Sequence, residues 1–186
     1  QVQAQSQKRL LNTVARWGEM IKFSHSIFAL PFALMATFLA ARTSFLHGDS
    51  AQVWPHPIQL GLIVVCMVAA RSVAMTFNRI VDAAIDARNP RTAIRAIPAG
   101  VVTKWQAGVF LAIAAGVFEI SCTGFYLFAG NSWPLMLSLP VLGYLCLYSY
   151  AKRLTRWTHF ILGSAIALSP PAAWLAIHPR SLGLPA

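Results

Sequence analysis

Apolar residues gather in five runs along the chain, and each run is about as long as the helix needed to cross a bilayer. The runs cover residues 21–41, 58–85, 107–129, 133–151 and 157–177, with short polar segments between them. Because nearly every position in a run is apolar, each helix is expected to face lipid and other helices. The pattern predicts an all-α fold, a multi-span transmembrane helical bundle. Residues 1–20 are polar and basic, and we expect them to lie on the membrane surface.

The composition excludes several other classes of protein. Hydrophobic residues make up 57% of the 186 residues and charged residues only 11%, whereas a soluble domain carries roughly 25% charged residues. The mean hydropathy is +0.59. These values exclude a soluble enzyme, a disulfide-stapled secreted domain and a disordered tail. The net charge of +10 reflects a scarcity of acids, of which there are five, so we expect no nucleic-acid partner.

The basic residues predict the orientation in the membrane. Positively charged loops stay on the cytoplasmic side. One set of connections holds Lys8, Arg9, Arg16, Lys22, Arg88, Arg91, Arg95, Lys104, Lys152, Arg153 and Arg156, whereas the alternate connections hold only Arg42 and Arg180. We therefore expect an integral protein of the bacterial inner membrane whose N-terminus is cytoplasmic.

The second run carries polar residues on one face. At 100° per residue, Arg71, Asn78, Asp82 and Asp86 fall within an arc of about 80°, and Arg79 lies at its edge. Amide and carboxylate oxygens are ligands that Mg²⁺ prefers, and it commonly binds one or two carboxylates together with a substrate phosphate. The face therefore suits Mg²⁺ and a diphosphate whose hydrocarbon tail lies in lipid.

A structural interpretation of the same residues is that Asp82 and Asp86 only pair with Arg79 or Arg88 at the end of a helix. The depth of Arg71 argues against it. Arg71 lies roughly 10 Å inside the hydrocarbon layer, where an unpaired charge costs at least about 2.5 kcal/mol. Such a residue needs a partner or a polar cavity. Together with the basic loop that follows, this depth favours a functional site.

The polar face also resembles a known family. Arg71-x6-Asn78-x3-Asp82-x3-Asp86, followed by Arg91-Thr92-x2-Arg95-x2-Pro98-x-Gly100, is similar to the first aspartate-rich motif of the intramembrane aromatic prenyltransferases, the UbiA superfamily. The resemblance is strongest to the 4-hydroxybenzoate polyprenyltransferases. Tyr148-Ser149-Tyr150-Ala151-Lys152-Arg153 resembles the Tyr-x3-Lys-Arg element of that family, and Lys22 matches a basic residue near the start of its first helix.

The resemblance implies a Mg²⁺-dependent enzyme that transfers a polyprenyl group from polyprenyl diphosphate to a small aromatic acid such as 4-hydroxybenzoate, in ubiquinone or menaquinone biosynthesis. It implies that the metal ligands are Asn78, Asp82 and Asp86, and that Asp82, Asp86, Lys152 and Tyr148 have catalytic roles. The substrate-binding residues that it implies are Lys22, Arg71, Arg91, Arg95 and Arg153. Lys22 has the alternative role of holding the carboxylate of the acceptor.

Two departures from the family pattern set further expectations. Arg79 stands where the family usually has Asp, which we interpret as the mark of a subgroup. The family has about nine spans and a second acidic motif, whereas five spans are present here. We therefore expect residues 21–186 to be the N-terminal part of one transmembrane domain, inactive on its own.

Other functions remain open on the sequence alone. One alternative is a non-catalytic membrane subunit or lipid-binding protein, and another is a relative that prenylates haem, chlorophyllide, a naphthoate or a glyceryl phosphate. Cys66, Cys122 and Cys146 occur singly in apolar runs and are expected to face lipid or the core. Glu119 is the one acid within an apolar run that the motif does not use. Ser169-Pro170-Pro171 is expected to break the last helix.

Overall fold

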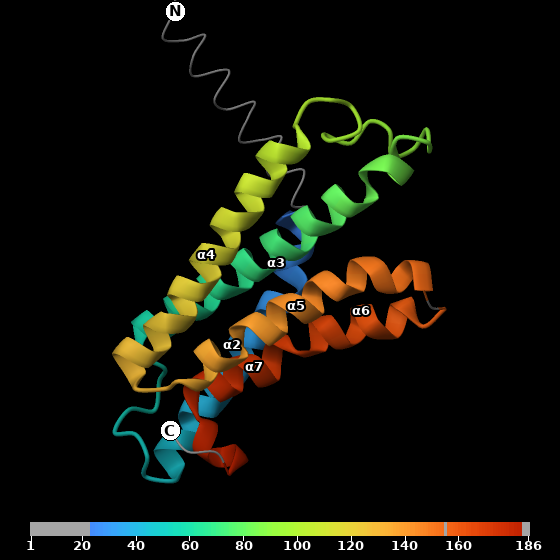
Figure 1. The fold of residues 1–186 in the computed structure, drawn as a ribbon. Coiled ribbons are helices and arrows are strands. Elements are labelled where there is room, and N and C mark those ends of the chain that lie inside the picture. The colour runs from blue at the N-terminus through green and yellow to red at the C-terminus, as the bar shows by residue number, and fades with distance from the viewer. Residues whose placement is uncertain (1–22, 155, 184–186) are drawn as a thin grey trace, which may run out of the picture.

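All regular secondary structure in the described part of the chain is helical, which confirms the predicted fold class. The computed structural model describes residues 23–154 and 156–183, and the side chains in these ranges except those of residues 23–28, 152–154 and 181–182. The helices, drawn in Figure 1, are α2 (Phe23–Leu46), α3 (Pro57–Asp86), α4 (Lys104–Ala129), α5 (Trp133–Leu154), α6 (Thr158–Ala167) and α7 (Ser169–Ile177), followed by a short 3₁₀ helix at Pro179–Leu182.

Five helical segments in the described residues are long and apolar enough to cross a membrane, as predicted. They are Ala29–Leu46, Pro57–Asp86, Lys104–Ala129, Trp133–Ala151 and Thr158–Ile177. The predicted boundaries agree with these within a few residues except at the first span, where α2 continues to Leu46 instead of ending at residue 41. The interfacial segment predicted for residues 1–20 lies outside the described residues.

Local sequence signals account for the ends of α3 and α4. The side chain of His56 accepts a hydrogen bond from the backbone N–H of Ile58, and the side-chain oxygen of Gln59 accepts one from the backbone N–H of His56. Thr103 and Gln106 form the same reciprocal pair at the start of α4. Gly130 ends α4 with a φ of 67°, a left-handed conformation that glycine adopts without a steric penalty.

The last predicted span consists of two helices in succession. α6 ends at Ala167, and α7 begins at Ser169 with two prolines directly after it. Proline provides no backbone N–H for the preceding turn, so a continuous ladder of hydrogen bonds cannot form there. The predicted break at Ser169-Pro170-Pro171 is confirmed. Pro31 and Pro140, in contrast, lie inside α2 and α5 without ending them.

Two clusters of buried side chains hold the bundle together. One joins α2, α3, α4 and α7 and comprises Ala33, Ala36, Ile63, Phe125, Ala173 and Ala176. The other joins α3, α4 and α5 and comprises Ala69, Val73, Ala114, Phe118, Cys122 and Leu142. The many alanines allow helices to approach closely, as is usual in membranes. At Gly124 an added Cβ would lie 2.9 Å from a methyl carbon of Leu62, so α3 and α4 are in close contact there.

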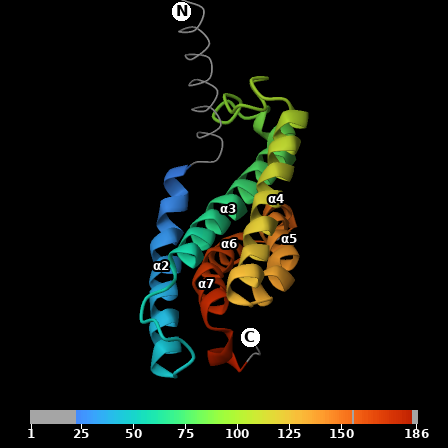
Figure 2. The same ribbon diagram turned by 90° about the vertical axis from the view of Figure 1, so that its left-hand side faces the viewer.

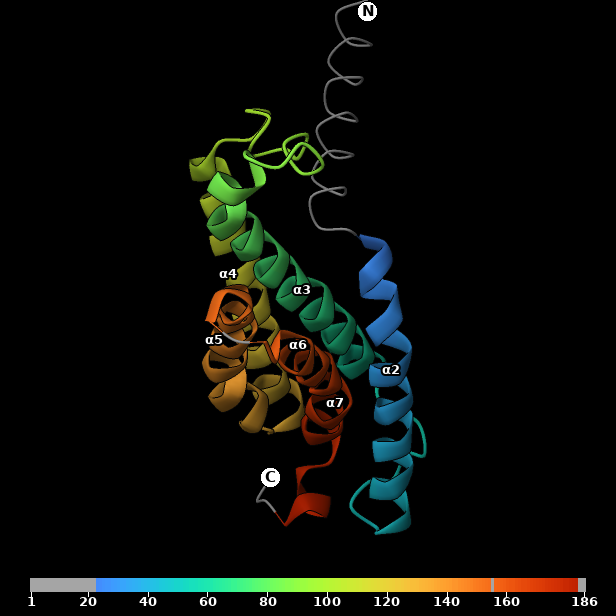
Figure 3. The same cartoon turned by 90° about the vertical axis from the view of Figure 1, so that its right-hand side faces the viewer.

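The arrangement of the helices leaves the second half of α3 beside α4 and α5. α2 lies at one edge of the bundle, alongside α7 and the first half of α3 (Figures 2 and 3). The α3–α4 loop lies at the opposite end of the bundle from the α2–α3 connection and the 3₁₀ helix at Pro179–Leu182. We call these the Asp86 end and the Asp49 end. The polar face of α3 therefore leads to the Asp86 end.

Candidate metal and diphosphate site

The predicted polar face is formed by the second half of α3. This helix continues without interruption to Asp86, so the spacing of one helical turn between the two carboxylates is preserved. Asp82 and Asp86 are both buried, with 8% and 6% of their surfaces exposed, and Asn78 is half-buried one turn earlier. A buried carboxylate requires hydrogen-bond donors or cations around it. The end of α3 is therefore a polar site inside the bundle.

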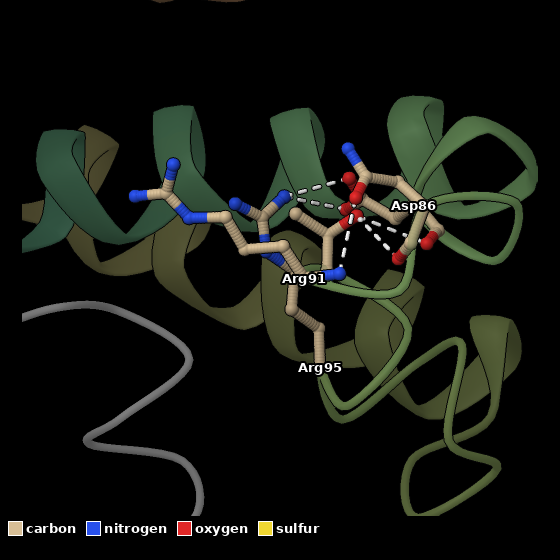
Figure 4. Close-up of polar contacts among 5 residues, drawn as sticks. Asp86, Arg91 and Arg95 are labelled. Carbon is tan, nitrogen blue, oxygen red and sulfur yellow. Dashed lines mark hydrogen bonds and ion pairs between the residues drawn. The ribbon is translucent and has the colours of Figure 1, made fainter.

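Asp86 is held by the loop that follows it. Nη1 of Arg95 donates to both carboxylate oxygens of Asp86, at 2.7 Å each (Figure 4). The hydroxyl of Thr92 donates to the backbone carbonyl of Asp86 at 3.0 Å. These contacts fold the α3–α4 loop back over the end of the helix. The structural interpretation named Arg79 or Arg88 as the partner of the carboxylates, whereas the partner observed for Asp86 is Arg95.

Arg91 belongs to the same loop but has a different position. Its backbone N–H donates to the side chain of Asn89 at 3.0 Å, which fixes the turn. Its side chain is exposed and runs back along α3, away from Asp86 (Figure 4). The structure therefore separates two arginines that the motif groups together. Arg95 neutralises a carboxylate, whereas the guanidinium of Arg91 points away from that pair.

Arg71 lies deeper in the bundle, beside α5. It is half-buried and interacts electrostatically with Tyr148 of α5. One turn and a half later, Phe77 contacts Tyr150 with ring centroids 5.9 Å apart, which fixes α5 against α3. The Nε atom of Arg71 is buried and has no hydrogen-bond partner among the described residues. A buried N–H that lacks an acceptor is available to an anion.

Arg79 completes the charged group at this end. It is half-buried and interacts electrostatically with Asp82, Asp86 and Arg95. Of the other predicted residues, Lys22 lies outside the described residues, as do the side chains of Lys152 and Arg153. The backbones of these last two belong to the end of α5. The structure thus groups Arg79, Asp82, Asp86 and Arg95 at the end of α3, with Asn78 one turn before Asp82, and it places Arg71 near Tyr148 deeper along the same helix.

The donor set at the Asp86 end fits Mg²⁺. Asp82, Asp86 and Asn78 offer oxygen ligands from successive turns of one helix, and Asp86 retains unused lone pairs beside the two bonds from Arg95. Among the described residues, no group of three or more His, Cys, Asp or Glu side chains could hold a metal. Any metal there would rely on two carboxylates, an amide, water and substrate oxygens.

Three polar contacts elsewhere were not predicted. Nε2 of His178 lies 2.9 Å from one oxygen of Asp49, and Arg180 donates to the other at 3.0 Å. The sulfurs of Cys66 and Cys122 lie 3.9 Å apart across α3 and α4, and no spacing in the sequence pairs them. Glu119, near both thiols, has a buried Oε1 without a hydrogen-bond partner among residues 23–154 and 156–183. These contacts join positions 56 to 131 residues apart, and no local pattern identifies them.

Comparisons with known proteins agree with this arrangement. The fold is similar to an apo structure of a UbiA homolog from Aeropyrum pernix, with a TM-score of 0.69 and 29% identity over 83% of this chain and 50% of that one. Among curated relatives, the mitochondrial 4-hydroxybenzoate polyprenyltransferase of Drosophila melanogaster is 27% identical over 78% of this chain. A protoheme IX farnesyltransferase of Vibrio parahaemolyticus is 34% identical over 63%.

This chain spans 36% and 38% of the lengths of those two relatives. The model of the UbiA prenyltransferase family matches residues 29–185, which include every described helix except the start of α2. The chain belongs to the UbiA prenyltransferase family.

Proposed function

We propose that this chain supplies the metal and diphosphate site of an enzyme that transfers a polyprenyl group from polyprenyl diphosphate to a small aromatic acid such as 4-hydroxybenzoate. The product would be an intermediate of ubiquinone or menaquinone. The observation that carries the proposal is the charged group at the Asp86 end, where two buried carboxylates and the guanidiniums of Arg79 and Arg95 occur together. The family membership makes prenyl transfer the chemistry that this group would serve.

In this proposal Asn78, Asp82 and Asp86 hold Mg²⁺. When bound, the ion neutralises negative charge on the diphosphate as it leaves. The chain contributes fixed cations for the same purpose, because charge that develops on a leaving group is stabilised best by groups already in position. Arg95 contacts Asp86 directly, Arg71 lies deeper on the same helix, and we assign Arg91, Lys152 and Arg153 to the same role. Arg91 would have to turn from its present direction to reach the site.

The reaction breaks the bond between the allylic carbon and the diphosphate oxygen. The electron pair goes to the diphosphate, and the aromatic ring attacks the allylic carbon and then loses a proton. Tyr148 would line the position of the allylic carbon, since it interacts electrostatically with Arg71 from the neighbouring helix. An electron-rich ring near an allylic cation stabilises it through its π face. Lys22 would meet the diphosphate or the acceptor carboxylate.

Haem is the second candidate acceptor. Protoheme IX farnesyltransferases match this chain at 33–37% identity, and 4-hydroxybenzoate prenyltransferases at 27–30%. The two acceptors differ greatly in size and colour, so binding experiments separate them. We place the site on the cytoplasmic side of a bacterial inner membrane, because the basic α3–α4 loop belongs to the Asp86 end.

The proposal is tested by substrate binding to the full chain in lipid nanodiscs. Farnesyl thiolodiphosphate, a slowly reacting donor analogue, should bind saturably in the presence of Mg²⁺. Arg71→Gln and Arg95→Gln should each weaken its binding roughly tenfold or more, because each removes charge-assisted hydrogen bonds to phosphate. Arg42→Gln, a charge removed from the other end of the bundle, is the matched control. Absence of saturable binding, or equal effects of all three substitutions, would refute the site.

The acceptor is tested in the presence of the same analogue. Radiolabelled 4-hydroxybenzoate should bind saturably by equilibrium dialysis, and its binding should depend on the analogue. Haem should produce no saturable change in absorbance. A saturable haem spectrum together with no binding of 4-hydroxybenzoate would replace the proposed acceptor while leaving the diphosphate site intact.

A further inference from the structure

Two thiols face each other where α3 and α4 are in close contact. The sulfurs of Cys66 on α3 and Cys122 on α4 lie 3.9 Å apart. Within one helical turn of them, an added Cβ at Gly124 would lie 2.9 Å from a methyl carbon of Leu62. Cys122 is buried in the cluster that joins α3, α4 and α5, and Cys66 packs against that cluster. The packing of the two helices therefore sets the separation of the sulfurs.

This separation suits an ion between the sulfurs better than a bond between them. A disulfide bond is about 2.05 Å long, so the sulfurs would have to approach each other by about 2 Å. Metal–thiolate bonds are about 2.3 Å long, so two of them span at most about 4.6 Å. A separation of 3.9 Å lies within that span. One ion therefore joins the sulfurs without moving either helix.

The ligands that are present select the ion. Thiolates favour soft ions, chiefly Cu(I), Zn²⁺ and the iron of iron–sulfur clusters. Structural Zn²⁺ sites and iron–sulfur clusters take four protein ligands. Across residues 23–154 and 156–183, no group of three or more His, Cys, Asp or Glu side chains could hold a metal, although Cys146 of α5 packs against the same cluster. Cu(I) is the soft ion that two thiolates alone can satisfy.

Glu119 gives the thiol pair an acidic neighbour. It precedes Cys122 by three residues on α4, and side chains three apart on a helix are neighbours on one face. Its Oε1 is buried and has no hydrogen-bond partner within the described part of the chain. An acid inside a membrane span is costly and usually has a function. Beside two thiols, a carboxylate attracts a cation and can accept a proton.

We propose that Cys66 and Cys122 bind one Cu(I) ion as thiolates, and that Glu119 accepts one of the two protons that they lose. Two S–H bonds break and two Cu–S bonds form, and sulfur is not oxidised. The second proton leaves to water, so one Cu⁺ replaces one H⁺ and the charge of the site is unchanged. This matters in an apolar interior, where an added unpaired charge is costly.

The site lies in the first half of α3 and is separate from the polar face of the second half, so it does not depend on the proposed function. A bound ion would link α3 to α4. The structural alternative is that both cysteines only fill space between the helices, as small apolar residues do. Uptake of Cu(I) would then not depend on these two cysteines in particular.

The experiment uses the full chain in lipid nanodiscs, reduced and free of oxygen, with Cu(I) supplied from the competing chelator bathocuproine disulfonate. The wild type should take up one Cu(I) per chain, and X-ray absorption should show two sulfur ligands at about 2.3 Å. Cys66→Ser and Cys122→Ser should each lower the affinity by roughly a hundredfold or more, because each removes one of two ligands. Cys146→Ser is the matched control and should bind like the wild type.

The role of Glu119 is tested by counting protons. Calorimetric titrations in buffers of different ionisation enthalpy give the number released for each ion bound. The wild type should release one proton and Glu119→Gln two, because an amide accepts none. Release of two protons by the wild type would overturn the assignment of Glu119 to the site.

The copper site itself is overturned if the wild type takes up no Cu(I) against the chelator, or if Cys66→Ser and Cys122→Ser keep wild-type affinity. Loss of uptake in Cys146→Ser would overturn it too, because the ion would then be bound elsewhere. The number of sulfur ligands is measured on the wild type and does not depend on the folding of any variant. A single sulfur ligand there would also contradict the proposal.

Discussion

Arg95 donates from a single nitrogen to both carboxylate oxygens of Asp86, at 2.7 Å each, across a sequence separation of nine residues. The pair joins the last residue of α3 to the loop that leads to α4. Two residues proposed for different tasks, metal binding and diphosphate binding, thus contact each other directly. The same contact holds the α3–α4 loop against the end of α3, and the accessibility of that loop can be measured.

Breaking this pair should release the α3–α4 loop. Asp86→Asn removes the charge that holds Arg95, and a hydrogen bond to a charged group contributes about 1.5–3 kcal/mol, less where water reaches the pair. Trypsin should then cleave after Arg88, Arg91 or Arg95 roughly fivefold faster than in the wild type, because cleavage requires local opening. The cleavage rate is measured by mass spectrometry.

Asp49→Asn is the control for this prediction. It makes the same substitution in an ion pair at the other end of the bundle. This variant should leave cleavage of the α3–α4 loop unchanged. If Asp86→Asn also left the loop as resistant as in the wild type, the pair with Arg95 would not be what holds the loop in place.

The two carboxylates should be needed for metal uptake. Mn²⁺ accepts the same oxygen ligands as Mg²⁺ and is visible by electron paramagnetic resonance. Asp82→Ala and Asp86→Ala should each weaken Mn²⁺ binding in the presence of the diphosphate probe by at least about tenfold, because each removes an anionic ligand. Circular dichroism of both variants in nanodiscs should match the wild type. Unchanged Mn²⁺ affinity in both would assign the carboxylates a structural role.

The contact between Cys66 and Cys122 predicts a specific cross-link. Their sulfurs are 3.9 Å apart, so they must approach by about 2 Å to reach disulfide bonding distance. Treatment with diamide should therefore form one intramolecular disulfide and lower the mass by two hydrogens. Cys146→Ser should retain this product and Cys66→Ser should lose it. A disulfide that includes Cys146 would contradict the packing of α3 against α4.

The ion pairs of Asp49 predict a pH dependence at the other end of the bundle. Hydrogen bonds from His178 and Arg180 hold the pKa of Asp49 below its ordinary value of 3.8. A lowered pKa means that the stabilisation is complete above the ordinary value and is lost as the pH falls through the lower, folded-state value. Wild type should therefore unfold at a higher temperature than Asp49→Asn at about pH 5, where carboxyl groups rather than imidazoles titrate on further acidification.

The difference between these two proteins should shrink to zero as the pH falls below the folded-state pKa of Asp49. The difference in unfolding temperature is measured by circular dichroism during thermal unfolding in detergent micelles. A difference that stays constant from about pH 5 to about pH 2.5 would show that the substitution acts through packing and not through the charge of Asp49.

The sequence predicted the spans and the polar face because both are local. Length and hydropathy determine which segments cross a membrane, and one helix of uniform pitch determines that Arg71, Asn78, Asp82 and Asp86 share a face. The break before Pro170 followed from the missing N–H of proline. The first span was the exception, since α2 continues beyond residue 41 to Leu46.

The contacts between distant residues could not be predicted. The pair of Arg95 with Asp86 depends on how an irregular loop folds, and such a loop has no period that a sequence pattern could reveal. The proximity of Cys66 to Cys122 and of Asp49 to His178 depends on which helices become neighbours. Lys22, and the side chains of Lys152 and Arg153, lie outside the described residues, so their predicted roles stay predictions.

The central claim, that the polar face of α3 binds a prenyl diphosphate, is tested most directly by photolabelling. The probe is a farnesyl diphosphate analogue with a diazirine on its first isoprene unit, used with the full chain in nanodiscs and mapped by mass spectrometry. Labels should fall on α3 between Arg71 and Asp86 and on α5 near Tyr148, and excess inorganic pyrophosphate should suppress them. Labels spread over the outward face of α4 around Ile113 and Ile120, or gathered at the Asp49 end and unaffected by pyrophosphate, would contradict the claim.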